Sequence, residues 1–128
     1  MRSTAPSDIL KQIKVLITET SYKHYNENAP DKAVYPFVTY ELSNSFSNED
    51  TEVFVLDIDG WDSYTDAVGT QRLETMMSVI TAKLQESVNA LTGASMRFIL
   101  DNRKTLHEPD TSIRRKKYTF QVRYIGRE

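Results

Sequence analysis

The stretch that decides the fold is Val53-Phe54-Val55-Leu56-Asp57-Ile58-Asp59-Gly60-Trp61-Asp62. Its side chains alternate in character. Phe54, Leu56 and Ile58 fall on one face of an extended chain, and valines followed by aspartates fall on the other. This alternation predicts a β-strand with one face on the core. Gly60-Trp61-Asp62 predicts a turn that leads into a helix. Such a strand builds a sheet and carries no chemistry of its own.

On the N-terminal side of this strand, the sequence predicts a helix, a loop and another strand. Apolar residues recur at helical spacing behind Ser7, a good N-cap, so we expect a helix over residues 7–22. Turn-forming residues over 24–35 predict a loop. Phe37-Val38-Thr39-Tyr40-Glu41-Leu42 predicts a strand because it is rich in β-branched and aromatic residues. Ser43–Asp50, which is polar apart from Phe46, predicts a hairpin connection or a flexible flap.

On the C-terminal side, Ser63-Tyr64-Thr65-Asp66 matches a capping box, and a helix is predicted over 64–91. Alternation predicts strands over 95–101 and Ile113–Ile125, with a loop over Asn102–Ser112 between them. The order α-β-β-α-β-β predicts an α+β fold. We expect a largely antiparallel four-stranded sheet with two helices packed mainly on one face.

Composition narrows the class of protein. The chain has 128 residues, which fits a single domain over 1–128. It has no cysteine, which excludes disulfides, zinc–thiolate sites and thiol catalysis. No apolar run approaches the roughly 18 residues of a transmembrane helix. The first residues lack an apolar signal core, so synthesis in the cytoplasm is expected.

The charge is unevenly distributed along the chain. The net charge is −2, but residues 1–96 carry 7 Lys/Arg and 14 Asp/Glu, whereas residues 97–128 carry 9 and 4. One interpretation is two solvated faces of different sign. The other is that the acidic part of one subunit meets the basic part of the next. Opposite patches on one molecule suit head-to-tail contacts, which close into rings where the rotation permits.

The spacing of the possible metal ligands does not match known metal-binding motifs. The stretch from Asp57 to Asp62 superficially resembles a calcium loop, but glycine falls at position 4, and position 12 is Val68 where the EF-hand needs Glu. An exposed acidic strand end explains it better. His24 and His107, with the adjacent Glu108, lie 83 positions apart in predicted loops, and no spacing supports a shared metal.

Catalytic patterns are equally weak. The chain has no Gly-x-Ser-x-Gly elbow and no glycine-rich phosphate loop. Glu49 and Asp50 could do acid–base work, but an exposed acidic turn is the better interpretation. We therefore expect no enzyme, no catalytic residue, no metal and no cofactor.

The strongest charge run is Arg114-Arg115-Lys116-Lys117. It fits an edge strand protected by charge, a protein–protein contact, or phosphate binding with Tyr118 and Phe120 stacking on bases. Those two aromatics look more like the core face of the last strand. Trp61 is either core, partly buried at the base of the long helix, or an interface anchor. The interface candidates are Arg114, Arg115, Lys116, Lys117, Asp57, Asp59 and Trp61.

The layout resembles the tail terminator (tail completion) family of long-tailed bacteriophages and prophages. The features behind this are Tyr35-Pro36-Phe37-Val38-Thr39-Tyr40, the polar hairpin, and Val53–Trp61 ending in Asp-Gly-Trp. The long helix and the terminal pair of strands with the Arg114–Lys117 run complete it. The resemblance covers most of the chain as pattern and element order. The family supplies no invariant motif, so no functional residue is carried over.

The resemblance implies a non-enzymatic ring, typically a hexamer, that caps the tail tube, ends its polymerisation and docks the head connector. The implied partners are other copies of the chain, the tail tube protein and a head connector or neck protein. No membrane is implied, and no nucleic acid except DNA passing through the ring. The protein would assemble in the bacterial cytoplasm and reside in the tail–neck region of the virion.

The resemblance adds one expectation, and the two-faced character of Val53–Asp62 adds another. The Ser43–Glu52 and Asn102–Ser112 segments would be docking loops. Asp57 and Asp59 would be available to the Arg114–Lys117 run of another subunit. The alternatives are another phage neck or connector component, and a ferredoxin-like small binding or regulatory module.

Overall fold

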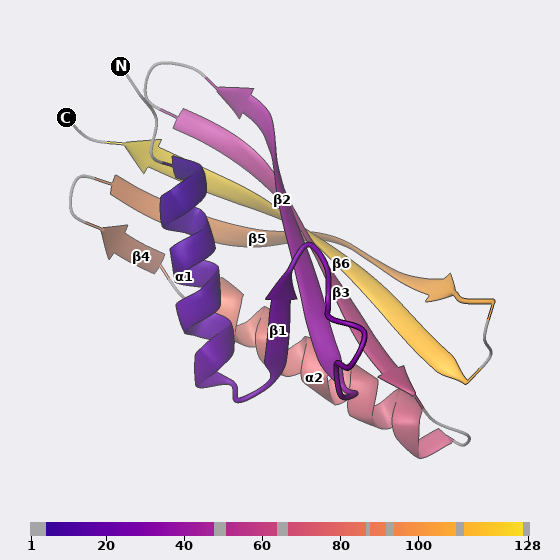
Figure 1. Cartoon of the computed structure of the whole chain (residues 1–128). Helices are drawn as coiled ribbons and strands as arrows, with labels where there is room; N and C mark the ends of the chain where they lie inside the picture. The colour runs from indigo at the N-terminus through magenta and orange to yellow at the C-terminus, as the bar shows by residue number, and fades with distance from the viewer. Residues whose placement is uncertain are drawn as a thin grey trace.

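The computed structural model describes residues 5–47, 51–63, 67–86, 88–91, 94–109 and 112–126. In these residues, two helices lie against one face of a twisted sheet (Figure 1). The elements are α1 Ala5–Glu19, β1 Lys23–Asn26, β2 Phe37–Ser47, β3 Thr51–Ser63, α2 Ala67–Glu86, β4 Val88–Leu91, β5 Ala94–His107 and β6 Ile113–Gly126. The α+β class and the placement of both helices on one face are confirmed.

The sheet has six strands in the order β1-β2-β3-β6-β5-β4. Every neighbouring pair is antiparallel except β1 and β2, which are parallel. The expectation of four strands is therefore wrong, because the short edge strands β1 and β4 were not predicted. The expectation of a largely antiparallel sheet holds for the other strand pairs.

The strand β3 is an inner member of the sheet, paired with β2 on one side and β6 on the other. Its burial alternates from Phe54 onward, which confirms the predicted faces. The predicted turn at Gly60 is wrong, because β3 continues through Trp61 to Ser63. A Cβ at Gly60 would collide with the side chain of Met77 in α2, so the missing side chain allows the helix to lie close to the strand.

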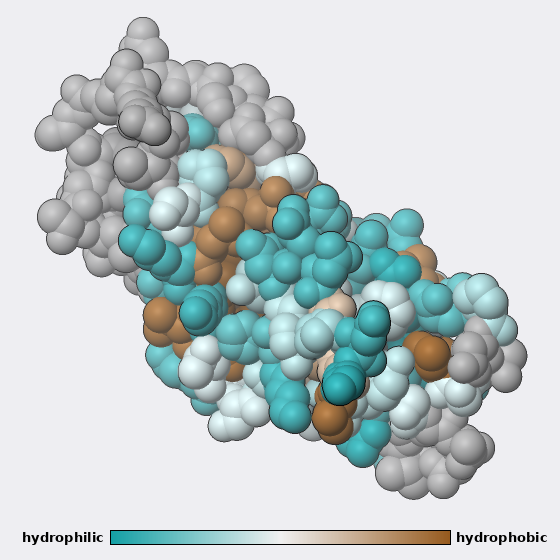
Figure 2. Space-filling view, in the orientation of Figure 1, coloured by the Kyte–Doolittle hydropathy of each residue, from teal (hydrophilic) through white to brown (hydrophobic). Residues whose placement is uncertain are grey.

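The core lies between the helices and the sheet. Each helix contributes the apolar face that its spacing predicts, and the strands contribute every second residue. The largest fully buried side chains are Phe54, Phe98, Phe120, Ile9, Ile13, Ile17, Leu56, Ile58, Leu73, Met76, Met77 and Ile80. On the surface of this side, Figure 2 shows a hydrophobic strip beside α1, where the helix faces β2, bordered by hydrophilic residues.

Several predicted boundaries are wrong, and strand pairing is the reason in each case. The second helix ends at Glu86, because Val88–Leu91 pairs with β5 instead of continuing the helix. The predicted loop at 24–35 contains β1, which pairs with β2. Most of the predicted Asn102–Ser112 loop is strand, since β5 runs to His107 against β6. None of the described helices is long and apolar enough to cross a membrane.

The region predicted as a hairpin connection (Ser43–Asp50) and as a docking loop (Ser43–Glu52) is also mostly strand. β2 extends to Ser47 and β3 begins at Thr51, with the two strands paired from end to end. Residues 48–50 lie outside the described residues, as do residues 110 and 111 of the second predicted docking loop. Deleting either predicted loop in full would therefore remove paired strand, and the idea of two dispensable loops is corrected accordingly.

Candidate functional site

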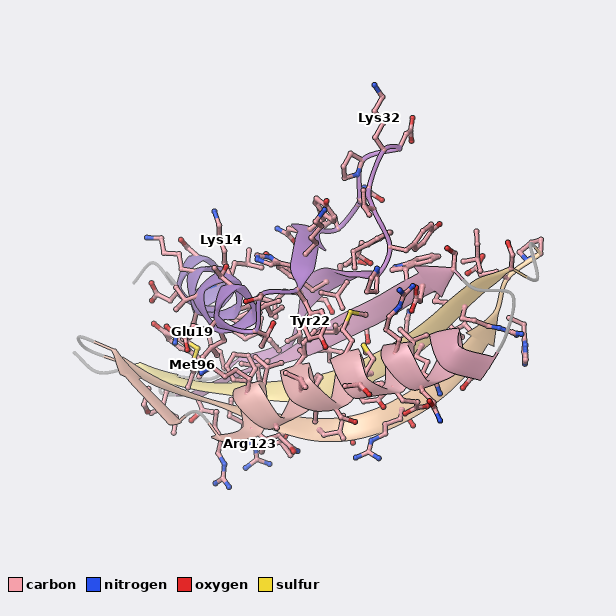
Figure 3. The ribbon with its side chains drawn as sticks, turned by 90° about the horizontal axis from the view of Figure 1, so that it is seen from below. Lys14, Glu19, Tyr22, Lys32, Met96 and Arg123 are labelled. Carbon is pink, nitrogen blue, oxygen red and sulfur yellow. The ribbon has the colours of Figure 1, made fainter. Side chains whose placement is uncertain are left out.

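The candidate site is the sheet face opposite the helices, called here the open face. Residues directly opposite each other in an antiparallel pair share a face. The register therefore assigns alternate residues of β2, β3, β6 and β5 to the open face, with the alternation shifted at the irregularities in β2 and β5. Figure 3 shows Arg123 pointing away from the helices on this side. The charged residues of the open face are Glu41, Asp57, Asp59, Arg97, Lys104, Arg115, Lys117 and Arg123.

The charge of the open face is divided between its strands. The acids lie on β2 and β3, whereas the cations lie on β6 and β5. We call Arg97, Lys104, Lys117 and Arg123 the basic half. Arg97 lies opposite Arg123 in the register, and Lys104 lies opposite Lys117. Like charges directly opposite one another destabilise a strand pair, so this half of the sheet holds electrostatic repulsion.

The basic half finds no counter-charge within the described part of the chain. Arg97, Lys104, Lys117 and Arg123 form none of the ion pairs found there. Arg123 instead donates a hydrogen bond from Nε to Oε1 of Gln121 at 2.9 Å. A surface of this kind favours an anionic partner, because cationic side chains arranged opposite each other raise the local potential.

Arg115 lies on the same face but is bound inside the chain. Its Nη2 donates to Oδ2 of Asp59 at 2.7 Å, and its Nη1 donates to Oε1 of Glu108 at 3.2 Å. Its guanidinium also lies 4.5 Å from the centre of the Trp61 ring. Desolvation opposes the charged form, but the hydrogen bonds and attraction to both carboxylates outweigh it and raise the pKa of Arg115. Arg115 therefore links β6 to Asp59 of β3 and to Glu108.

A row of aromatic rings continues from Arg115 along the sheet. Trp61 stacks on Phe37 with ring centroids 6.2 Å apart, and Phe37 stacks on Tyr35 at 5.2 Å. Tyr25 meets Phe37 edge-on at 5.8 Å. Trp61 is half-buried on the open face, so its predicted place at the base of the long helix is wrong. Sequence reasoning missed this row because its rings come from segments that only the sheet order brings together.

The predicted interface residues divide between the two faces. Alternation along β6 places Arg115 and Lys117 on the open face, and Arg114 and Lys116 on the helix side. Lys116 pairs with Glu74 of α2. The strand is also not an edge, since it lies between β3 and β5. The four-residue run is therefore not one continuous basic patch.

The predicted acidic partners already have contacts within the chain. Asp59 binds Arg115, and Asp57 accepts a hydrogen bond from Oγ1 of Thr119 at 2.7 Å. Both partners lie on β6, because β3 and β6 pair in register along their whole length. The expectation that both carboxylates are free to bind another subunit is therefore corrected, because each already has a contact within the chain. Their role in an interface stays a prediction.

The metal alternatives lose support from the geometry. The strands β1 and β5 are separated by three others, which places His24 and His107 roughly 19 Å apart at the usual strand spacing. Asp57 and Asp59 lie on the open face, whereas Asp62 is buried on the helix side and bound to Arg72. Within the described ranges, no group of three or more His, Cys, Asp or Glu could hold a metal ion.

The remaining candidates are the two stacking aromatics and the acid–base pair. Tyr118 and Phe120 are buried against the helices, so they cannot stack on nucleic-acid bases as the nucleic-acid alternative requires. Glu49 and Asp50, the candidate acid–base pair, lie outside the described residues. The described side chains that stand out are therefore the charges and rings of the open face.

Comparison with known proteins gives a likeness in fold. No family model matches the chain, and no curated protein matches it. A chain in a solved structure described as "Virion of native gene transfer agent (GTA) particle" superimposes with a TM-score of 0.63 and 16% sequence identity. The match covers 88% of this chain and 85% of that chain. The two chains therefore share a fold over nearly their whole lengths.

Proposed function

We propose that this chain is a non-enzymatic structural protein of a phage-like particle. In this proposal it forms a ring, most simply a hexamer, on the end of the tail tube, stops tube growth and presents a surface to the head connector. It would assemble in the bacterial cytoplasm and remain in the tail–neck region of the virion. Its partners would be other copies of itself, the tail tube protein and a neck protein, with DNA only passing through the ring.

The observation that carries this proposal is the fold shared with a chain of a gene transfer agent virion over 88% of the present sequence. The resemblance of the element order to tail terminators supports the finer assignment. The open face adds a physical reason for assembly, because an acidic partner surface would relieve the repulsion between its like-charged pairs.

The charge balance favours a head-to-tail contact over a two-fold dimer. In a two-fold dimer, the acids of one open face would have to neutralise the basic half of the other. Asp59 is already ion-paired with Arg115, and Asp57 is half-buried and hydrogen-bonded to Thr119. Glu41 is therefore the exposed acid among the residues that the register assigns to this face. The basic half therefore suits an acidic surface elsewhere on the next subunit, which is the geometry that generates rings.

A capping assay tests the proposed function. Purified protein is mixed with tail tubes assembled from the tube protein of the same particle, and further tube protein is then added. We expect rings on tube ends by electron microscopy, and capped ends that do not elongate. Tubes that grow equally fast with and without the protein would contradict the proposal. A ring found at another layer of the neck, with tube growth unaffected, would favour the connector alternative.

A matched pair of charge reversals tests the role of the open face. Lys104→Glu places an acid within the basic half, whereas Lys32→Glu makes the same change in the loop that projects away from the sheet (Figure 3). We expect Lys104→Glu to reduce the number of capped tube ends and Lys32→Glu to leave it unchanged. The wild-type contact should weaken as salt rises, because surface charges are screened. Equal capping by both variants would exclude the basic half from the contact.

A further inference from the structure

A second surface lies at the edge of the sheet, where α1 passes the edge strand β1. Two hollows of ≈ 540 and ≈ 480 Å³ open there, and they share His24 and Tyr25 as lining residues. We call this surface the α1–β1 groove. Residues that define it are Leu10, Lys11, Lys14, Lys23, His24 and Tyr25. The two hollows therefore form one surface that follows β1.

The strand β1 offers a free edge to this groove. It ends the sheet order, and its described backbone pairs only with β2, from Lys23↔Phe37 to Asn26↔Tyr40. The backbone groups on the outer edge of such a strand are a template for another extended chain. Peptides are often bound by addition of a strand to an exposed edge, where backbone hydrogen bonds give affinity and side chains give specificity.

The charge of the groove is uniformly positive. Lys11, Lys14 and Lys23 are exposed and line it, and no aspartate or glutamate lines either hollow. Figure 3 shows Lys14 extending from α1 away from the sheet. Among nearby acids of α1, Asp8 accepts a hydrogen bond from the Tyr124 hydroxyl at 2.6 Å, and Glu19 pairs with Lys83. Both carboxylates are therefore engaged by Tyr124 and Lys83.

The pKa of His24 responds both to burial and to the charge of the groove. The Thr18 hydroxyl donates to the backbone carbonyl of Lys14 at 2.6 Å, so its oxygen accepts from Nε2 of His24 at 3.1 Å. Burial, followed by the charge of Lys14, lowers the pKa of His24 below its ordinary value. An anion bound in the groove would act in the opposite direction. His24 is therefore a built-in reporter of occupancy.

We propose that the α1–β1 groove binds an acidic, extended peptide segment of a partner protein, which joins the sheet as an additional strand beside β1. The free edge accounts for the extended conformation, and the lysines account for the acidic sequence. Leu10 offers partly buried apolar surface for the side chains between the acids. This proposal does not depend on ring formation, since the groove lies at the β1 edge of the sheet, away from the basic half on β5 and β6.

The experiment uses a defined probe. A fluorescein-labelled peptide of sequence Thr-Glu-Val-Glu-Val-Glu-Thr is titrated with the full chain at low salt, alongside the same peptide with glutamine in place of glutamate. We expect the acidic peptide to bind and the glutamine peptide to bind more weakly. The double variant Lys11→Glu/Lys14→Glu should weaken binding about tenfold, since two attractive contacts become repulsive. The matched variant Lys32→Glu/Arg103→Glu, at two exposed positions outside both the groove and the basic half, should bind within about twofold of wild type.

Two further readouts distinguish strand addition from simple charge attraction. Amide hydrogens of β1 should gain protection from exchange when the acidic peptide binds, and the pKa of His24 measured by NMR should rise. Absence of binding, equal binding by both double variants, or binding without protection of β1 would each overturn the proposal. Protection of β1 that grows with protein concentration in the absence of peptide would assign the groove to a second copy and would also overturn it.

Discussion

The two faces of the sheet differ in whether their charged side chains form ion pairs. On the helix side, charged groups find partners across layers: Asp62 is fully buried and bound to Arg72, and Glu74 of α2 pairs with Lys116. On the open face, Lys104 lies opposite Lys117 and Arg97 opposite Arg123. The same strand, β6, supplies residues to both surfaces. The ion pairs between α2 and the sheet are therefore completed within the chain, whereas the basic half forms no ion pair with the described residues.

The largest expected difference in stability is between two single variants at neighbouring positions of β6 whose side chains lie on opposite faces of the sheet. Phe120→Ala should lower the free energy of unfolding by about 3–5 kcal/mol, because Phe120 is fully buried against the helices. Thr119→Val, which removes the hydrogen bond to Asp57, should cost about 1 kcal/mol. Denaturant unfolding measures both. Equal losses would show that the two faces are not energetically distinct.

A smaller effect tests the close approach of α2 to β3. Gly60→Ala should lower the free energy of unfolding by about 1–3 kcal/mol, because the added Cβ would collide with Met77 and lie 3.0 Å from Cδ1 of Leu73. Met77→Ala makes room for it. In a double-mutant cycle, Gly60→Ala should therefore cost less in the Met77→Ala background than in wild type. Additive losses would contradict the packing described here.

On the open face, by contrast, a charge reversal should raise the free energy of unfolding. Lys104→Glu should stabilise the isolated subunit by about 0.2–1 kcal/mol, because it replaces a like-charged pair across from Lys117 with an attractive one. The gain should shrink as salt is added. Thermal unfolding at two salt concentrations measures it, with Lys32→Glu as the control. A loss of stability in Lys104→Glu would mean that this lysine already has a favourable partner.

The smallest effect concerns pH on the helix side. The pKa of His24 is lowered in the folded chain by burial and by Lys14, whereas the unfolded chain titrates near the ordinary value of about 6.5. Below that pH the unfolded state binds the proton more readily, so the contribution of His24 to stability is present above pH 6.5 and is lost as the pH falls through the folded pKa. The difference in unfolding free energy between wild type and His24→Gln, measured from pH 7.5 to pH 5, should therefore decline. A flat difference would contradict the lowered pKa.

Much of the fold follows from local pattern. Alternation in β3 and helical spacing in α1 and α2 identify the core positions, because each pattern matches the geometry of its own element. The short strands β1 and β4 do not follow from local pattern. Their four residues become strand only through pairing with β2 and β5, which are contacts that periodicity does not encode.

The candidate site was predictable in part. The uneven charge of the sequence and the Arg114–Lys117 run drew attention to β6, and alternation assigns Lys117 to the open face. The repulsive pair that Lys117 forms with Lys104 required the register of β5. That register includes a shift between Leu100 and Asn102, which changes the face of every following residue. A simple count of alternate positions along β5 therefore fails.

The central claim is that the open face is completed by another subunit in a ring on the tail tube. A cryo-electron microscopy reconstruction of tube ends incubated with the protein tests it most directly. We predict a closed ring at the tube end in which Arg97, Lys104, Lys117 and Arg123 of each subunit lie against an acidic surface of the next. Bare tube ends, or a ring whose open faces all point to solvent, would contradict the account.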